Sequence, residues 1–335
     1  MKALITGISG FCGSHLAEHL LAQGYQVSGI EVSSARMDNL QAVLDRIDLH
    51  RADLRDREQM QRILAELQPD QIYHLAARTN PFLGAQHSPQ GVGDSLRSGS
   101  QYQTLYEANV YGTINLLDAA SILNCGCAVL ITGSSAQYGV VPLQENPILE
   151  THPFRPVTHY AVTKATQDLL GSMYGAAGRL HVVRTRTFNI VGPRQSPQFV
   201  SSAFAQQVAQ IEQGRREPVI EVGNLEALRD FVDVRDVVGA YRLALEHGRS
   251  GGAYNVSSGR GRSIRSLLDG LLAISTVTAI DVRQDPTRLQ SADVPLQVGS
   301  YQLLRDDTGW QPEIAWEQTL RDLLEYWREA VNRRQ

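Results

Sequence analysis

Near its start the chain reads Ala3-Leu4-Ile5-Thr6-Gly7-Ile8-Ser9-Gly10-Phe11-Cys12-Gly13. Its apolar opening predicts a buried strand, and the apolar repeat that follows predicts a helix. Of the glycines between them, Gly7 permits a tight turn, Gly10 lets the backbone approach a pyrophosphate, and Gly13 lets the helix pack closely on the sheet. N–H groups at a helix start bind anions. The stretch therefore predicts a dinucleotide site made by Gly7, Gly10, Phe11, Cys12 and Gly13.

Strand and helix patterns alternate over the first half of the chain, which indicates an α/β fold with a parallel sheet covered on both faces. Right-handed crossovers make this a doubly wound, Rossmann-type fold. Strands are expected at Ala3–Thr6, Gln26–Val32, His50–Leu54, Ile72–Ala76, Ala128–Thr132 and Leu180–Arg184. The main helices are expected at Met37–Leu44, Arg57–Leu67, Asn109–Leu123 and Tyr160–Tyr174.

Prolines and glycines cluster after Thr187, which suits a second, smaller domain. We predict a dinucleotide-binding domain over residues 1–186 and an α/β substrate domain over 187–335, with a segment near 230–245 returning to the first. The stretch Asn80–Ser100 is rich in Gly, Ser, Pro and Gln and lacks periodicity. A structureless segment of that length is usually a lid, a binding loop or disordered.

Composition excludes several function classes. The 335 residues carry a net charge of -4, so the chain has no general attraction for nucleic acid or anionic membranes. We expect neither a membrane segment nor a signal sequence, and therefore a cytoplasmic protein. Three cysteines without repeated spacing predict no disulfide framework and no metal site, but small buried side chains in a reducing compartment.

Glu31 lies near the end of the second predicted strand, 18 residues after Gly13. A carboxylate there accepts from both ribose hydroxyls and repels a 2′-phosphate, which favours NAD(H). Arg36 lies close enough in sequence to receive the phosphate of NADP(H) instead, so that cofactor stays possible. A solvated Glu and Arg in a loop is the alternative without function.

Tyr160 and Lys164 are four residues apart on a predicted helix and therefore share a face. An ammonium beside a phenol stabilises phenolate and lowers its pKa, which makes the tyrosine a proton donor or acceptor. Ser134 follows the strand that ends at Thr132, at the edge where ligands bind in such sheets. Its hydroxyl is placed to hold the substrate oxygen that gains or loses the proton. A lone serine there would more often be a turn or cap residue.

In combination these patterns resemble the extended short-chain dehydrogenase/reductase family. The resemblance rests on the glycine loop, Asp53, His74-Leu75-Ala76-Ala77, Asn109-x-x-Gly112-Thr113, Ser134, Tyr160-x-x-x-Lys164 and Asn189, and it covers nearly the whole chain. It implies that Ser134, Tyr160 and Lys164 are catalytic. It also implies that the cofactor is contacted by Asp53 (at adenine), Leu54, Leu75, Ala76, Ala77, Asn109, Thr132, Tyr160 and Lys164. The sequence pattern by itself is also consistent with Asn109 as a helix N-cap.

The alanine at position 136 limits which reactions of this family the chain can catalyse. Sugar-nucleotide 4,6-dehydratases of this family place a glutamate two residues before the Tyr of a Tyr-Gly pair, and in Ser134-Ser135-Ala136-Gln137-Tyr138-Gly139 that position is alanine. Alanine is neither an acid nor a base, so dehydration is disfavoured. Hydride transfer at C4 is left, as in a reductase or a 4-epimerase.

The second half resembles the GDP-mannose branch of the family, and within it the GDP-4-dehydro-6-deoxy-D-mannose reductases more than the dehydratases. The stretches that carry this likeness are 186–200, 223–236 and 285–295. The resemblance implies substrate contacts from Ser135, Asn189, Arg194, Val200, Arg229, Arg288 and Asp293, with Glu221 an alternative to Asp293 at the nucleoside. Arginine suits a diphosphate because its planar fork bonds phosphate bidentately, although a single arginine is more often a surface ion pair.

The resulting hypothesis is NAD(P)H-dependent reduction of the C4 ketone of a GDP-linked 4-keto-6-deoxyhexose, with NAD(H) favoured. Two alternatives stay open: an NAD-dependent nucleotide-sugar 4-epimerase and a non-catalytic dinucleotide sensor. The helices Asn109–Leu123 and Tyr160–Tyr174 carry apolar residues on more than one face. The family resemblance implies a homodimer through these helices.

Overall fold

The main sheet of the computed structural model holds seven strands in the order β10-β6-β5-β4-β1-β2-β3. The structure describes residues 1–79, 99–123, 126–286 and 295–333. Every pairing in this sheet is parallel, which confirms the predicted doubly wound Rossmann-type fold. The strands are β1 Lys2–Thr6, β2 Gln26–Glu31, β3 Ile47–Arg51, β4 Gln71–His74, β5 Ala128–Ser134, β6 His181–Thr187 and β10 Ala253–Val256.

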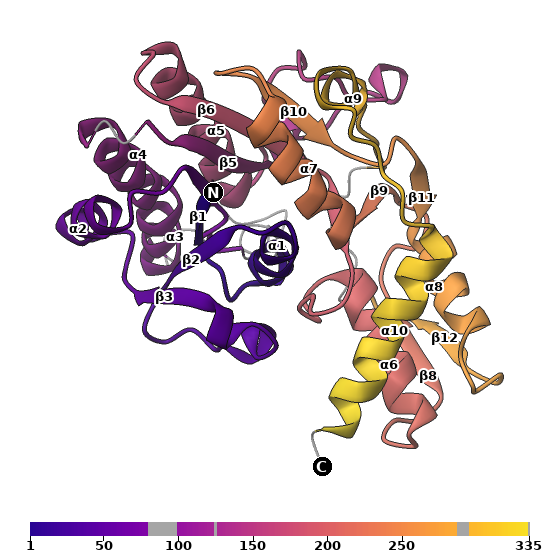
Figure 1. The fold of residues 1–335 in the computed structure, drawn as a ribbon. Coiled ribbons are helices and arrows are strands. Elements are labelled where there is room, and N and C mark those ends of the chain that lie inside the picture. Colours follow the sequence, from indigo (N-terminus) through magenta and orange to yellow (C-terminus); the bar gives the residue numbers. More distant parts are fainter. Residues whose placement is uncertain (80–98, 124–125, 287–294, 334–335) are drawn as a thin grey trace.

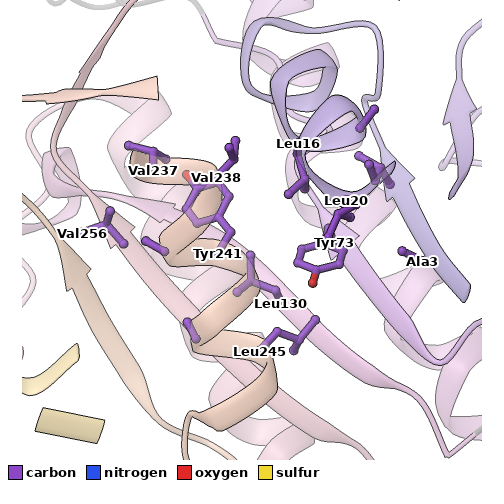
Figure 2. Packing of buried hydrophobic residues seen from close by; sticks show 14 of the residues in the cluster. Ala3, Leu16, Leu20, Tyr73, Leu130, Val237, Val238, Tyr241, Leu245 and Val256 are labelled. Carbon is purple, nitrogen blue, oxygen red and sulfur yellow. The ribbon is translucent and has the colours of Figure 1, made fainter. Parts of the chain in front are cut away.

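Helices cover both faces of this sheet (Figure 1). One face carries α1 (Phe11–Ala22) and α7 (Val234–His247), and the other carries α2 (Arg57–Leu67), α4 (Gly112–Ile122) and α5 (His159–Ala176). Figure 2 shows Val238 and Tyr241 of α7 facing Leu16 of α1, while Leu245 lies beside Tyr73 and Leu130 of the strands. Because both faces bury apolar side chains, the strands read as continuous apolar runs.

A smaller lobe holds the second core (Figure 1). Its helices are α6 Val200–Glu212, α8 Ile264–Ala273 and α10 Trp316–Asn332. Its strands are β7 Asn189–Val191, β8 Val219–Val222, β9 Leu228–Asp233, β11 Gly261–Ser263, β12 Asp281–Gln284 and β13 Leu296–Gln297. In one small sheet β9 lies between β11 and β13 and also pairs with β7, while β8 pairs with β12.

The chain crosses between the two lobes more than once. After β9 it returns to the main sheet as α7, whose apolar residues join the core around α1, and β10 then extends that sheet at its edge. The short helix α9 (Gln302–Thr308) also packs there through Leu304. Residues 234–256 therefore belong structurally to the main sheet, although they follow residue 186.

Several local predictions need correction. The helix predicted at Met37–Leu44 is wrong, because the segment forms two separate 3-10 turns, at Asp38–Leu40 and Leu44–Arg46. Its apolar residues recur every third position, a spacing that 3-10 turns satisfy as well as an α-helix. The strand expected at His50–Leu54 instead occupies Ile47–Arg51, where it pairs in register with β2.

The helix predicted from Asn109 starts earlier, as α3 (Gly99–Tyr106), and continues through a π-helical turn at Glu107–Tyr111 into α4. Gly99 and Ser100, predicted as loop, are therefore helical, and the rest of the Asn80–Ser100 stretch lies outside the described residues. The cysteine prediction is also wrong in part, because Cys127 is disulfide-bonded while Cys12 is a free thiol. Composition carries no information on a bond between two particular cysteines.

Within the described ranges, no helix combines the length and the apolar composition that a bilayer crossing requires. The same ranges bring together no group of three or more His, Cys, Asp or Glu side chains able to hold a metal ion.

Candidate active site

The glycine loop between β1 and α1 has the geometry of an anion cradle. Gly7 has φ +72°, and a Cβ there would lie 2.8 Å from the Cα of Ala76, so the loop following β4 packs directly against it. A Cβ on Gly13 would lie 2.2 Å from the Gly7 carbonyl oxygen. The N-cap of α1 is Gly10, which has no side chain to occupy the first-turn N–H groups. These residues fit a dinucleotide pyrophosphate.

Glu31 lies at the end of β2, beside this loop. Its Oε2 accepts from the Ser9 N–H at 3.0 Å and from the Ser9 hydroxyl at 2.7 Å. Ser9 therefore holds the carboxylate in one orientation at the predicted ribose position. The Arg36 guanidinium is instead paired with Asp38 at 2.7 Å and is largely exposed.

Asp53, predicted at adenine, follows β3. Its two carboxylate oxygens accept from Arg55, whose Nη2 lies 2.7 Å from Oδ2. These hydrogen bonds hold the pKa of Asp53 below its ordinary value, so this residue stays ionised. The neighbouring Leu54 is buried against the α4 helix, where it limits the space beside Gly112.

The predicted catalytic residues meet where β5 ends beside α5. Thr158 caps the start of α5 by accepting from the Ala161 N–H, and the four-residue spacing puts Tyr160 and Lys164 about one helical turn apart. Lys164 is 4% exposed, and its Nζ donates to the Thr132 carbonyl oxygen at 2.7 Å. Ser134 ends β5 and caps the following 3-10 turn, with its Oγ accepting from the Ala136 N–H at 3.2 Å.

Burial dominates the protonation of this site. It raises the pKa of Tyr160 to about 12, and a side-chain hydrogen bond with Ser134 only partly opposes the shift. Burial also lowers the pKa of Lys164 to about 8 and raises the pKa of the Cys12 thiol to about 12. The predicted lowering of the tyrosine pKa by Lys164 is therefore wrong for this structure. The phenol is protonated at neutral pH, which is the form that donates a proton.

The loop carrying Ser134 is tied to α5 by a buried network that the sequence analysis missed. Gln137 accepts from the Ser134 N–H through Oε1 at 3.4 Å and donates through Nε2 to Asp168 Oδ2 at 3.0 Å. Asp168 also accepts from Arg184 and Arg186, at 2.5 and 2.8 Å. Because Asp168 follows Lys164 by four residues, helical spacing was the signal that could have found it.

A second buried chain joins the glycine loop to α4. The Thr6 hydroxyl lies 2.8 Å from His74 Nδ1, and His74 Nε2 lies 2.8 Å from the Thr113 hydroxyl. Thr113 donates to the Asn109 carbonyl oxygen, and Thr6 accepts from the Ala76 N–H, so a neutral imidazole protonated on Nε2 satisfies every member. Burial lowers the pKa of His74 to about 3.

We expect His74 to make the protein less stable in mild acid. Its folded-state pKa lies below the ordinary value of about 6.5, so the unfolded chain binds the proton first as the pH falls. Between pH 7.5 and 5.5 this linkage removes about 1.4 kcal/mol of unfolding free energy. Urea titrations of the wild type and of His74→Gln at both pH values measure it. The variant should lack that increment, and equal pH dependence in the two proteins would refute the assignment.

Asn109 lies in the π-helical turn, so the N-cap alternative is wrong. Its Oδ1 accepts from the Arg78 N–H at 2.7 Å, and its Nδ2 donates to the Arg78 carbonyl oxygen and to the Thr163 hydroxyl. The extra residue of a π turn often lies at a functional site. Here it lets one amide join the segment after Ala77 to the helix that carries Tyr160.

The predicted substrate residues are spread over the second lobe and its junction with the first. Ser135 starts the 3-10 turn after Ser134, and Val200 starts α6. Asn189 donates to the Asp230 carbonyl oxygen, while Arg229 lies on β9. Glu221 is paired with Arg216 at 3.3 Å. Arg288 and Asp293 lie outside the described residues.

Arg194 is held on the first lobe. Its guanidinium donates to Glu18 at 2.6 Å and to the Ser14 hydroxyl at 3.2 Å, both on α1. The residue has φ +72°, an unusual conformation for a non-glycine residue, which turns the chain towards α1 after Pro193. These contacts connect the helix of the glycine loop to the segment preceding α6.

The Rossmann-type sheet, the glycine loop and the grouping of Ser134, Tyr160 and Lys164 define an NAD(P)-dependent enzyme of the extended short-chain dehydrogenase/reductase class. The family model for GDP-mannose 4,6 dehydratase matches residues 4–323. The chain therefore belongs to this family, whose members use nicotinamide dinucleotides and act on sugar nucleotides.

Known proteins support the assignment along the whole length. The GDP-6-deoxy-D-mannose reductase of Pseudomonas aeruginosa is 33% identical over 330 residues, which cover 98% of each chain. The solved structure of RMD from Pseudomonas aeruginosa, complexed with NADPH, is 32% identical over 98% of this chain and 99% of that one, with a TM-score of 0.82. The solved structure of the UDP-glucose 4-epimerase of Thermus thermophilus, in complex with NAD, is 30% identical over 99% of this chain and 100% of that one, with a TM-score of 0.81.

Proposed function

We propose that this enzyme reduces the C4 ketone of a GDP-linked 4-keto-6-deoxyhexose, and that it works in the cytoplasm. Ala136 is the observation that carries the choice of reaction. The loop Ser134–Tyr138 contains no carboxylate, so nothing in it can remove the C5 proton and help to expel water, as a dehydratase requires. The similarity to GDP-6-deoxy-D-mannose reductase supports the choice of substrate.

Each candidate catalytic residue has a definite task in this reduction. Bound NAD(P)H supplies the hydride for C4. The Ser134 hydroxyl holds O4 of the sugar, and Tyr160, protonated at neutral pH, gives O4 the proton that completes the alcohol. Lys164 keeps the end of β5 in place, because its Nζ donates to the Thr132 carbonyl oxygen.

A turnover assay tests the function. Purified enzyme is mixed with GDP-4-keto-6-deoxymannose and either NADH or NADPH, and the loss of reduced nicotinamide is followed. One cofactor should be oxidised per sugar reduced. NADH should give the higher kcat/KM, because the Glu31 carboxylate held by Ser9 repels a 2′-phosphate.

The 4-epimerase remains the alternative, because the same three residues serve oxidation and reduction at C4. An epimerase should retain tightly bound NAD⁺ through purification and interconvert C4 epimers of a sugar nucleotide without net cofactor consumption. That result, or no cofactor oxidation with the keto sugar, would contradict the proposed reduction. No turnover with any sugar nucleotide, despite cofactor binding, would instead favour the sensor.

The proposal includes a homodimer. Tyr111 and the α5 residues Leu169 and Met173 are more than half exposed, and large apolar side chains gathered on neighbouring helices favour burial against a partner. We expect sedimentation to give twice the 36.9 kDa of one chain. Leu169→Glu should shift the mass towards one chain, while Leu143→Glu, at an equally exposed leucine in a 3-10 turn outside these helices, should not. A wild-type monomer at micromolar concentration would contradict the dimer.

A further inference from the structure

A short stretch of the second lobe reaches the predicted catalytic loop. It comprises residues 296–300, here called the bridging segment, which include β13 and lie just before α9. The Gln297 amide makes two hydrogen bonds to one residue: its Nε2 donates to the Ser135 carbonyl oxygen at 3.0 Å, and its Oε1 accepts from the Ser135 hydroxyl at 3.3 Å. Ser135 directly follows Ser134, the residue proposed to hold O4 of the sugar. Gln297 therefore holds both the backbone and the side chain of the residue beside that hydroxyl.

The bridging segment also bonds the chain that follows the catalytic loop. The Val298 N–H donates to Asn146 Oδ1 at 3.0 Å, and the Val298 carbonyl oxygen accepts from the Ile148 N–H at 2.8 Å. The Ser300 N–H donates to the Ile148 carbonyl oxygen at 2.9 Å. Ile148 is fully buried in a small apolar cluster with Tyr138, the last residue of the 3-10 turn in the catalytic loop. The bridging segment is therefore attached to the catalytic region at several points.

A buried carboxylate anchors the same segment in the second lobe. Asp230 on β9 is fully buried, and its Oδ2 accepts from the Gly299 N–H at 3.2 Å and from the Gly259 N–H at 3.0 Å. Its Oδ1 accepts from the N–H and from the hydroxyl of Ser258, both at 2.7 Å. β13 is also paired with β9 along the small sheet. Because buried donors and acceptors are costly to separate, the bridging segment cannot shift freely relative to the second lobe.

We infer that Gln297 is a positioning residue for the proposed reduction, which holds the Ser134 hydroxyl in a fixed place relative to the second lobe. This inference rests on the proposed function, and Gln297 acts in it through Ser135. Gln137 fixes the same loop within the first lobe through Asp168, so Gln297 supplies the matching contact from the lobe that carries several predicted substrate residues. Alignment of reacting groups matters because a misplacement of about 1 Å costs about a hundredfold in rate.

Gln297→Met in the full-length enzyme keeps the length of the side chain and removes both hydrogen bonds to Ser135. With GDP-4-keto-6-deoxymannose and NADH, we expect kcat to fall by about tenfold, while KM for the sugar changes by less than about twofold. Gln213→Met is the matched control, because Gln213 is also half-buried and donates to the Arg328 carbonyl oxygen at 3.0 Å inside the second lobe. It should leave kcat unchanged. An equal fall in both variants, or no fall in Gln297→Met, would overturn the inference.

A second measurement separates the positioning of Ser134 from a general weakening of the contact between the lobes. If Gln297 acts by placing the Ser134 hydroxyl, its loss has little effect once that hydroxyl is gone. In a Ser134→Ala enzyme, adding Gln297→Met should therefore lower the single-turnover rate, measured with excess enzyme, by less than about twofold. The same tenfold loss in both backgrounds, about as large without the hydroxyl as with it, would show a purely structural role and overturn the inference.

Hydrogen exchange tests the contact without any substrate. In the catalytic loop the Ala136 N–H donates to Ser134 Oγ, and the Gly139 N–H donates to the Ala136 carbonyl oxygen. In Gln297→Met these two amides should exchange faster by about fivefold or more, while the amides of β1 keep their wild-type rates. Unchanged exchange in the loop would overturn the inference whatever the substrate is. A wild type that oxidises no NADH with the keto sugar would overturn the proposed function, and the exchange rates would still decide whether Gln297 holds the loop.

Discussion

Tyr160→Phe is expected to lower kcat by about a thousandfold, within the range of about 10²–10⁴ that general acid–base groups contribute. The substitution keeps the ring that packs in the site and removes only the hydroxyl. The phenol is the proton donor in the proposed reduction, and burial keeps it protonated by raising its pKa to about 12. The Tyr160 hydroxyl also forms a side-chain hydrogen bond with Ser134, the residue proposed to hold O4.

Steady-state oxidation of NADH with saturating keto sugar measures the effect, and fluorescence titration with NADH measures cofactor affinity. The affinity should change little, because the glycine loop and Glu31, which we propose to hold the other half of the dinucleotide, are unchanged in this variant. Tyr174→Phe is the matched control, as Tyr174 lies on the same helix but bonds Asp118 at the surface. A Tyr160→Phe enzyme with kcat within tenfold of the wild type would rule out the assigned role.

Asp168→Asn is expected to lower the free energy of unfolding by about 3–5 kcal/mol, because it leaves two buried arginines without their counter-charge. The Asp168 side chain is only 1% exposed and accepts from Arg184, Arg186 and Gln137. Burial by itself would raise the pKa of this carboxyl, but Arg186 and Arg184 hold it below its ordinary value. The folded protein therefore depends on the charged form.

Urea unfolding at neutral pH measures the loss. The matched control is Glu226→Gln, which removes one carboxylate from an exposed pair with Arg265 and should cost less than about 1 kcal/mol. Because Gln137 joins Asp168 to the Ser134 loop, the Asp168→Asn variant should also lose activity at temperatures where it is still folded. A destabilisation below about 1 kcal/mol would show that the network is not a buried ionic one.

Local sequence patterns predicted correctly those elements in which the apolar spacing and the positions of special residues indicate the same structure. The helix Arg57–Leu67 was predicted with its observed bounds, because its apolar residues recur at helical spacing. In the structure Asp56 caps its start. Tyr160 and Lys164 were predicted to share a face because four residues complete about one helical turn. The glycine loop could be predicted because each glycine meets a separate local requirement of the backbone.

Patterns failed where a neighbour far along the chain decided the outcome. Helical spacing around Met37 did not distinguish a 3-10 turn from an α-helix, and the Asn39 side chain there bonds the Ser9 carbonyl oxygen. Asn109 looks like an N-cap in the sequence, yet α3 precedes it and its amide is used by Arg78. The sequence alone predicted a lowered pKa for Tyr160, whereas burial by the assembled fold raises it.

By itself, then, the sequence determined the class of fold, the cofactor loop and the identity of the candidate catalytic residues, because those depend on backbone freedom and helical periodicity over a few residues. Tertiary structure alone decided how Asp168 and Gln137 hold Ser134, how α7 returns to the main sheet, and how Gln297 of β13 reaches Ser135. These groupings join residues far apart in the chain, by 162 positions between Ser135 and Gln297 and by 223 positions between His19 and Arg242. Such contacts result from strand register and burial, and neither can be predicted from a short stretch of the sequence.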